Sequence, residues 1–192
     1  SLMPLLKDNE DVIEKLNDIK NGFQNLMKDK LNQMWANKLG LEKYDELLVN
    51  ELFSLMSLSK VDYTKFFRIL SDLPKDISFL KNCFYAPLSD QVKRYWNEWL
   101  NKWNFQIRKS NKLDNISKEM KLINPKFTWR EWLIAEAYEK AEDGDYSFLN
   151  ELQIVLSKPY DEQSDLIEKK FDRLRPLKFF NQGGISHYSC SS

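Results

Sequence analysis

The chain has 192 residues, of which 42% are hydrophobic and 14% aromatic, enough for one domain with a sizeable core or for two small ones. Lysine plus arginine equals aspartate plus glutamate at 29 each, so no net charge draws the chain toward nucleic acid or an anionic membrane. No apolar run approaches the ~20 residues of a membrane-spanning helix, and the run at 1–7 is too short for a secretory signal.

The first half of the chain shows helical periodicity. Apolar residues recur at steps of three and four over about 9–34, which predicts one long helix with a single apolar stripe. A second helix is predicted over about 44–58. Asp62 then stands where the N-cap of a short aromatic helix, about 63–70, would be expected.

The next predicted helix begins near Ser89 and carries an unusually aromatic stripe. Three tryptophans share one face of it, with basic residues nearby: Trp96, Trp99 and Trp103, and Lys93, Arg94, Lys102 and Arg108. Such a stripe could stack the bases of a single strand. Most of the basic residues lie off the tryptophan face, so we predict that the tryptophans are buried in the core.

The second half of the chain contains shorter helices. Residues 124–125 (Asn-Pro) mark a break, and Thr128 with Glu131 forms a predicted capping box for a helix that ends near 142. Asp145 is a candidate cap for the next helix, which ends before Pro159.

A last helix is predicted over about 161–174, and Pro176 ends it. No stretch alternates with period two, so we predict an all-α bundle or array of about seven or eight helices. We divide the chain into a helical domain, 1–176, and an extended polar tail, 177–192.

Few side chains suggest chemistry. His187 is the one histidine and lies in the predicted tail, which excludes multi-histidine metal sites. Carboxylates cluster at residues 139–145 and 161–162 without EF-hand spacing, so we predict turn and capping roles. Glycine-rich phosphate-binding motifs are absent. We therefore assign no catalytic, cofactor-binding or metal-binding residue to this chain.

The two cysteines are expected to differ. They stand 107 positions apart and match no zinc spacing or disulfide framework, which favours a reducing, intracellular compartment. Cys83 has largely apolar neighbours, and a buried, inert thiol is predicted. Cys190 lies third from the end between serines, where an exposed thiol would suit a redox or regulatory contact.

Several short strings resemble elements of one protein family, in the same order. They are Lys38-Leu39-Gly40-Leu41, Asp62-Tyr63-Thr64 with Phe66-Phe67-Arg68, Asn124-Pro125-Lys126 with Arg130, Gly144-Asp145-Tyr146-Ser147, Pro159-Tyr160-Asp161-Glu162-Gln163, and the terminal Cys190-Ser191-Ser192. Over about 34–192 the chain thus resembles the selenoprotein O family of pseudokinase-like protein adenylyltransferases.

The resemblance implies a function for a larger parent protein. The family has a kinase-like core that binds ATP and Mg²⁺ and transfers AMP to Ser, Thr or Tyr of protein substrates. None of its catalytic motifs occurs here, so the chain resembles the C-terminal helical region, inactive alone, which would buttress that core. Such a fragment is expected to expose an apolar patch. The compartment would be the cytoplasm in bacteria and the mitochondrion in eukaryotes.

The resemblance also assigns a role to Cys190. In the family, the cysteine or selenocysteine at this position can pair with a cysteine near the activation loop and couple activity to redox state. That partner would lie outside this chain. The alternative from another class is a stand-alone helical module whose aromatic stripe binds a partner helix. No nucleic-acid or membrane partner is expected.

Overall fold

The computed structural model describes residues 10–109 and 113–180, and within them the chain is all-α, as predicted. One isolated bridge, Val61 to Phe84, is the only β-type pairing recorded in these ranges. The helices are α1 (Glu10–Lys38), α2 (Glu46–Ser59), α3 (Tyr63–Leu70), α4 (Asp90–Lys109), α5 (Leu113–Ile123), α6 (Glu131–Glu142), α7 (Ser147–Leu156) and α8 (Asp165–Phe171), with two 3₁₀ helices, η2 (Ile77–Cys83) and η3 (Leu177–Phe180).

One predicted cap is confirmed, one is displaced and one is wrong. Asp62 accepts a hydrogen bond from the Lys65 amide at 3.0 Å and is the N-cap of α3. Asp145 accepts one from the Ser147 amide at 2.9 Å, but Tyr146, and not Asp145, stands at the N-cap of α7. The predicted capping box at Thr128 does not form. The Thr128 hydroxyl lies 3.4 Å from the Thr64 hydroxyl instead, so a contact with another helix replaces the local one, and α6 begins only at residue 131.

The last α-helix is shorter than predicted. It spans Asp165–Phe171 rather than about 161–174. The Gln163 amide donates to the carbonyls of Val155 and Lys158, at 3.1 and 3.2 Å, and so ties the preceding residues back onto the end of α7. This turn delays the start of α8.

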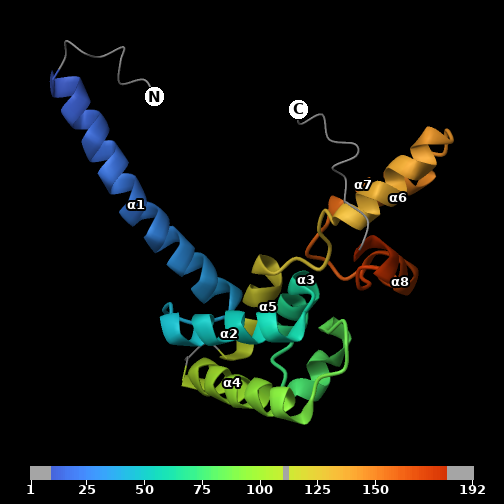
Figure 1. Cartoon of the computed structure of the whole chain (residues 1–192), viewed down its shortest axis with the longest axis horizontal. Helices are drawn as coiled ribbons and strands as arrows, with labels where there is room; N and C mark the ends of the chain where they lie inside the picture. Colours follow the sequence, from blue (N-terminus) through green and yellow to red (C-terminus); the bar gives the residue numbers. More distant parts are fainter. Residues whose placement is uncertain (1–9, 110–112, 181–192) are drawn as a thin grey trace.

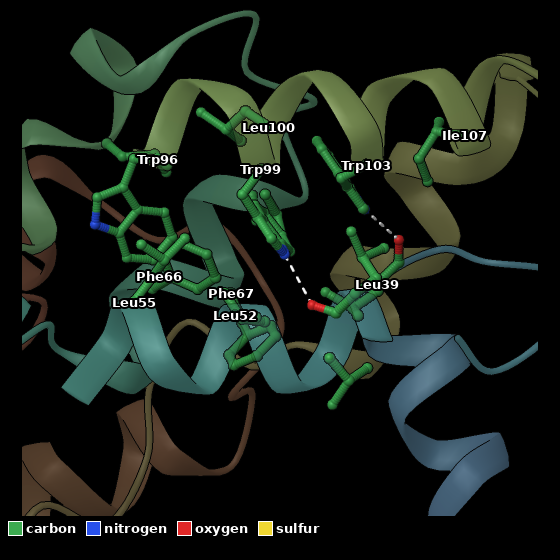
Figure 2. Close-up of a cluster of buried hydrophobic side chains, with 14 of the residues drawn as sticks. Leu39, Leu52, Leu55, Phe66, Phe67, Trp96, Trp99, Leu100, Trp103 and Ile107 are labelled. Carbon is green, nitrogen blue, oxygen red and sulfur yellow. Dashed lines mark hydrogen bonds between the residues drawn. The ribbon is translucent and has the colours of Figure 1, made fainter. Parts of the chain in front are cut away.

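The tryptophans of α4 form the centre of the first of two hydrophobic cores, where they face α2 and α3 (Figure 2). Trp96, Trp99 and Trp103 are at most 1% exposed, which confirms their predicted burial. Burial removes them as a surface for a partner helix or for stacked bases. A buried indole N–H needs an acceptor. The three acceptors are the Ser59 hydroxyl, the Leu48 carbonyl and the Leu39 carbonyl, at 2.8, 2.9 and 2.8 Å.

The second core is smaller and is built from α6, α7, α8 and η3. Its buried residues are Phe127, Trp132, Leu133, Ala137, Phe148, Leu152, Val155, Phe171 and Phe179. Phe179 shows that the chain still packs after Pro176, while Leu177 beside it is exposed. The first four residues of the predicted extended tail, 177–180, thus form η3. Residues 181–192, with His187 and Cys190, lie outside the described residues, where the tail stays a prediction.

Helix α1 differs from all the others because it extends away from both cores (Figure 1). Of its 29 residues only Ala36 is buried. The predicted apolar stripe is present but uncovered, with Ile19 68% and Phe23 58% exposed. We call Ile19, Phe23, Leu26, Met27, Leu31 and Met34 the α1 apolar face. In the part of the chain that the structure describes, no helix is both long and apolar enough to cross a membrane.

Candidate functional site

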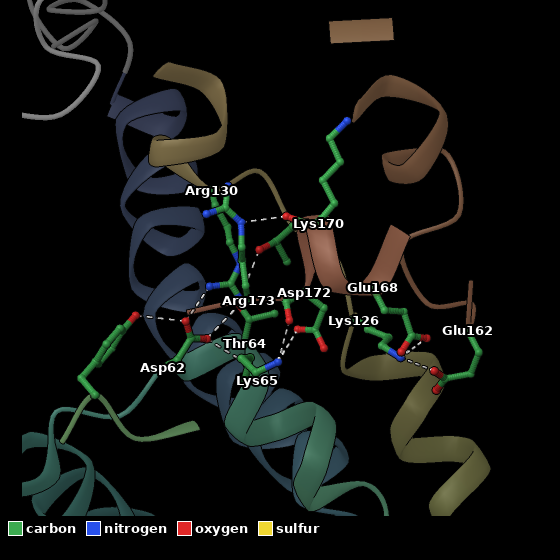
Figure 3. Close-up of polar contacts among 12 residues, drawn as sticks. Asp62, Thr64, Lys65, Lys126, Arg130, Glu162, Glu168, Lys170, Asp172 and Arg173 are labelled. Carbon is green, nitrogen blue, oxygen red and sulfur yellow. Dashed lines mark hydrogen bonds and ion pairs between the residues drawn. The ribbon is translucent and has the colours of Figure 1, made fainter. Parts of the chain in front are cut away.

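A buried ion pair joins the two cores (Figure 3). Arg130, just before α6, donates to both carboxylate oxygens of Asp62, at 2.5 and 3.1 Å. The Tyr85 hydroxyl donates to the same carboxylate at 3.0 Å. The side chains of Asp62 and Arg130 are only 3% and 10% exposed. Two-point contact of this kind fixes the orientation of both groups as well as their distance.

The environment of Asp62 favours its ionised form. Burial alone raises the pKa of this carboxyl, but hydrogen bonds and positive charge from Arg130, with the Lys65 amide and Tyr85, outweigh burial and lower the pKa. Burial and then the Asp62 charge raise the pKa of Tyr85 to about 12. Both groups are therefore locked in the protonation states that their hydrogen bonds require.

Arg68, from the same string as Asp62, crosses to the end of α5. Its guanidinium donates to the carbonyls of Lys121 and Asn124 at 3.1 and 3.2 Å, and to the Glu162 carboxylate at 2.6 Å. The last carbonyls of a helix have no partner within the helix. Arg68 thus supplies donors to two backbone carbonyls at this end of α5, and it also forms an ion pair with Glu162 in the turn after α7.

Glu162 and Lys126 complete this arrangement. The Lys126 ammonium contacts the carboxylates of Glu162 and Glu168, and the Lys126 amide donates to the Pro159 carbonyl at 2.8 Å. Partial burial opposes ionisation of Glu162, but Lys126 and Arg68 prevail and lower its pKa to about 2. The pKa of Lys126 is raised: burial acts against this, and the two carboxylates outweigh burial.

Asn124 connects three helix ends. It is fully buried, and its amide donates to the Lys38 carbonyl at 2.8 Å and to the Ser71 hydroxyl at 3.1 Å. Its carbonyl oxygen accepts from the Lys38 ammonium at 2.9 Å. The same ammonium lies 4.5 Å from the centre of the Phe67 ring. The base of α1 is thereby held to the ends of α3 and α5.

We call Asp62, Arg68, Asn124, Lys126, Arg130 and Glu162 the polar junction. Every one of them belongs to the strings singled out in the sequence, which were treated separately there. Sequence reasoning missed that these strings meet. The available signal was their charge: the first string carries Asp62 and Arg68, the second Lys126 and Arg130, and the third Glu162, so each string offers an opposite charge to another. Each charged member is paired, so the junction positions helices and presents no free nucleophile or base.

The other candidate residues fall outside the junction. In the described parts of the chain, no group of three His, Cys, Asp or Glu residues could hold a metal ion. Cys83 is fully buried, and its thiol lies 2.8 Å from the Leu80 carbonyl. The predicted burial of Cys83 is thus confirmed, and burial, with a contribution from the Asp62 charge, raises its pKa to about 12, which disfavours the reactive thiolate. Cys190, the predicted redox residue, lies outside the described residues.

The described residues form a helical module whose motif residues meet at one polar junction. The profile of the family "Protein adenylyltransferase SelO" matches residues 2–157, well over half of the chain. The chain belongs to this family. The match begins earlier than residue 34, where the predicted resemblance starts.

Curated relatives named "Protein nucleotidyltransferase YdiU" agree with this assignment. The relative from Flavobacterium johnsoniae is 30% identical over 204 residues, which cover 100% of this chain and 38% of the relative. Those from Aromatoleum aromaticum and Photobacterium profundum are 34% and 35% identical, with 83% and 84% of this chain and 32% and 33% of the relatives covered. The chain thus spans about a third of the length of the relatives it matches.

The junction predicts a pH dependence of stability. The pKa of Glu162 is about 2 in the fold and ordinarily 4.5, so its ion pairs stabilise the fold above about pH 4.5 and are lost as the pH falls toward 2. We expect Glu162→Gln to lower the free energy of unfolding at pH 7, and this difference to shrink between pH 4.5 and 2. Urea titrations at several pH values measure it. A difference that is independent of pH would contradict the role given to this carboxylate.

Proposed function

We propose that this chain is the C-terminal, non-catalytic helical part of a protein adenylyltransferase, an enzyme that transfers AMP from ATP to Ser, Thr or Tyr of proteins. Family membership supports the reaction, and the coverage of only about a third of each relative supports a larger parent. In that parent the helices buttress a kinase-like core, which binds ATP and Mg²⁺. The bacterial relatives favour the cytoplasm as its location.

The observation that carries the buttress role is the exposed α1 apolar face. Monomeric proteins rarely leave a row of large apolar side chains uncovered, and such rows mark sites of contact. The two cores close without this face: their buried residues start at Ala36, near the end of α1. In the proposal, the remaining two thirds of the parent chain supply the surface that covers the α1 apolar face.

Because the proposal places ATP binding in the kinase-like core, we expect that the 192-residue chain alone does not bind or use ATP. Its sequence lacks glycine-rich phosphate cradles, and each charged group of the polar junction is already paired. Titration calorimetry with Mg-ATP is expected to give no binding heat, and mass spectrometry no AMP adduct. Binding or self-modification would mean that a nucleotide site lies in these helices and that the proposal is wrong.

The buttress role predicts that one substitution has different effects in two contexts. Phe23→Ala should change the unfolding free energy of the 192-residue chain by no more than about 0.5 kcal/mol, because Phe23 is exposed there. In the full-length parent it should cost roughly 3–5 kcal/mol, the usual loss for a buried phenylalanine. Urea denaturation of both proteins makes the comparison. Equally small effects would refute a covered α1.

We further propose that Cys190 regulates the parent by forming a disulfide with a cysteine of the kinase-like core. A peroxide oxidises one thiol to a sulfenic acid and is reduced to water; the thiolate of the other thiol attacks that sulfur, and the oxygen leaves as a second water. Cys83 is a poor candidate for the partner because it is buried and its pKa is about 12.

The redox role predicts that Cys190→Ser makes AMP transfer by the parent insensitive to peroxide. Cys83→Ser is the matched control and should leave the response intact, because a buried thiol of high pKa does not react. Transfer of labelled AMP to a protein substrate, before and after peroxide and then dithiothreitol, measures the response. A peroxide effect that survives in the Cys190→Ser variant would rule out this switch.

A further inference from the structure

The distribution of charged residues around α1 indicates the chemistry of the surface that would cover its apolar face. Successive residues of a helix are turned by about 100°, so the sequence gives the position of each side chain around the axis. We take Phe23, in the middle of the α1 apolar face, as the reference. Lys15, Lys20 and Lys30 fall about 80°, 60° and 20° from it, so Lys20 and Lys30 lie among the apolar residues and Lys15 lies at their edge. The five carboxylates of α1 all fall farther away: Glu10, Asp11, Glu14, Asp18 and Asp29.

The lysines on this side of α1 are available to a partner. Lys15, Lys20 and Lys30 are all exposed, and none of the salt bridges in the described residues involves them. Lys38 also lies on this side, but it is held by Asn124. The face continues toward the body of the protein in a shallow groove lined by Met27, Leu31, Trp35 and Tyr44, among others.

We propose that the α1 apolar face docks on an apolar surface that carries carboxylates in the remainder of the parent chain. This rests on the proposed function and specifies the chemistry of the partner. An apolar contact that includes charges of one sign gains orientation and specificity when the opposite surface carries charges of the other sign. Uncompensated lysines within the contact would cost free energy on desolvation, so a basic or purely apolar partner surface fits less well.

Two other occupants fit the charges less well. A helix that lies on an anionic membrane carries a strongly basic polar face, whereas the face of α1 opposite Phe23 is acidic and the helix has five lysines against five carboxylates. A second copy of this chain would bring its own lysines against Lys15, Lys20 and Lys30, and like charges repel across an interface.

Hydrogen exchange of the α1 amides tests the proposal in the 192-residue chain and in the full-length parent. We expect the amides of residues 19–31 to exchange about tenfold or more slowly in the parent, because docking suppresses local opening. Lys20→Glu with Lys30→Glu should abolish that protection in the parent. The matched control, Asp18→Lys with Asp29→Lys, reverses the same number of charges on the opposite face and should keep it.

The outcomes separate this inference from the proposed function. Protection in the parent that survives Lys20→Glu with Lys30→Glu would overturn the proposed carboxylates of the partner surface and leave the buttress intact. Equal exchange in both wild-type proteins would remove the buttress itself. Protection in the 192-residue chain that rises with its concentration would assign the face to a second copy. Binding to phosphatidylserine vesicles would assign it to a membrane; either result overturns the inference.

Discussion

The buried ion pair between Asp62 and Arg130 is the contact on which most of the described architecture depends. Asp62 caps α3, accepts a hydrogen bond from the Tyr85 hydroxyl and pairs with Arg130, which precedes α6. One carboxylate therefore holds three segments of the chain in place. Two charges removed from water are tolerated only when each finds partners of good geometry. Losing either partner would leave the other buried and unpaired, at a cost of roughly 3–5 kcal/mol. The pair therefore specifies one arrangement of the two cores more strongly than apolar contact alone would.

The rest of the polar junction acts by the same principle at helix ends. Arg68 satisfies carbonyls where α5 ends, and Asn124 joins that end to the last residues of α1 and α3. Helix termini bring unpaired backbone groups wherever they are buried, and side chains from neighbouring helices are one way to satisfy them. These requirements give the charged and amide residues of the strings a structural role, because they pair with one another across the junction.

The sequence predicted the local structure well because local rules decide it. Period and caps placed both ends of α2 and α3, and the start of α4, within about two residues. The three tryptophans on one face of α4 were predicted to be buried from the position of the basic residues off that face. The capping box at Thr128 failed because a hydroxyl that could bond locally instead contacts Thr64, 64 positions away. The junction was missed for the same reason: charged residues in separate strings show their pairing only when the chain is folded.

Helix α1 shows what a sequence pattern encodes when its partner is absent. An isolated helix gains most of its stability from packing of its apolar face, and propensity alone supports a long helix only marginally in water. A face such as that of Ile19 and Phe23, with lysines along it and every carboxylate behind it, does nothing for the two cores seen here. The pattern therefore calls for a surface other than these two cores, and the proposed buttress takes that surface from the rest of the parent chain. Because the face also excludes negative charge, it carries information about that surface beyond its being apolar.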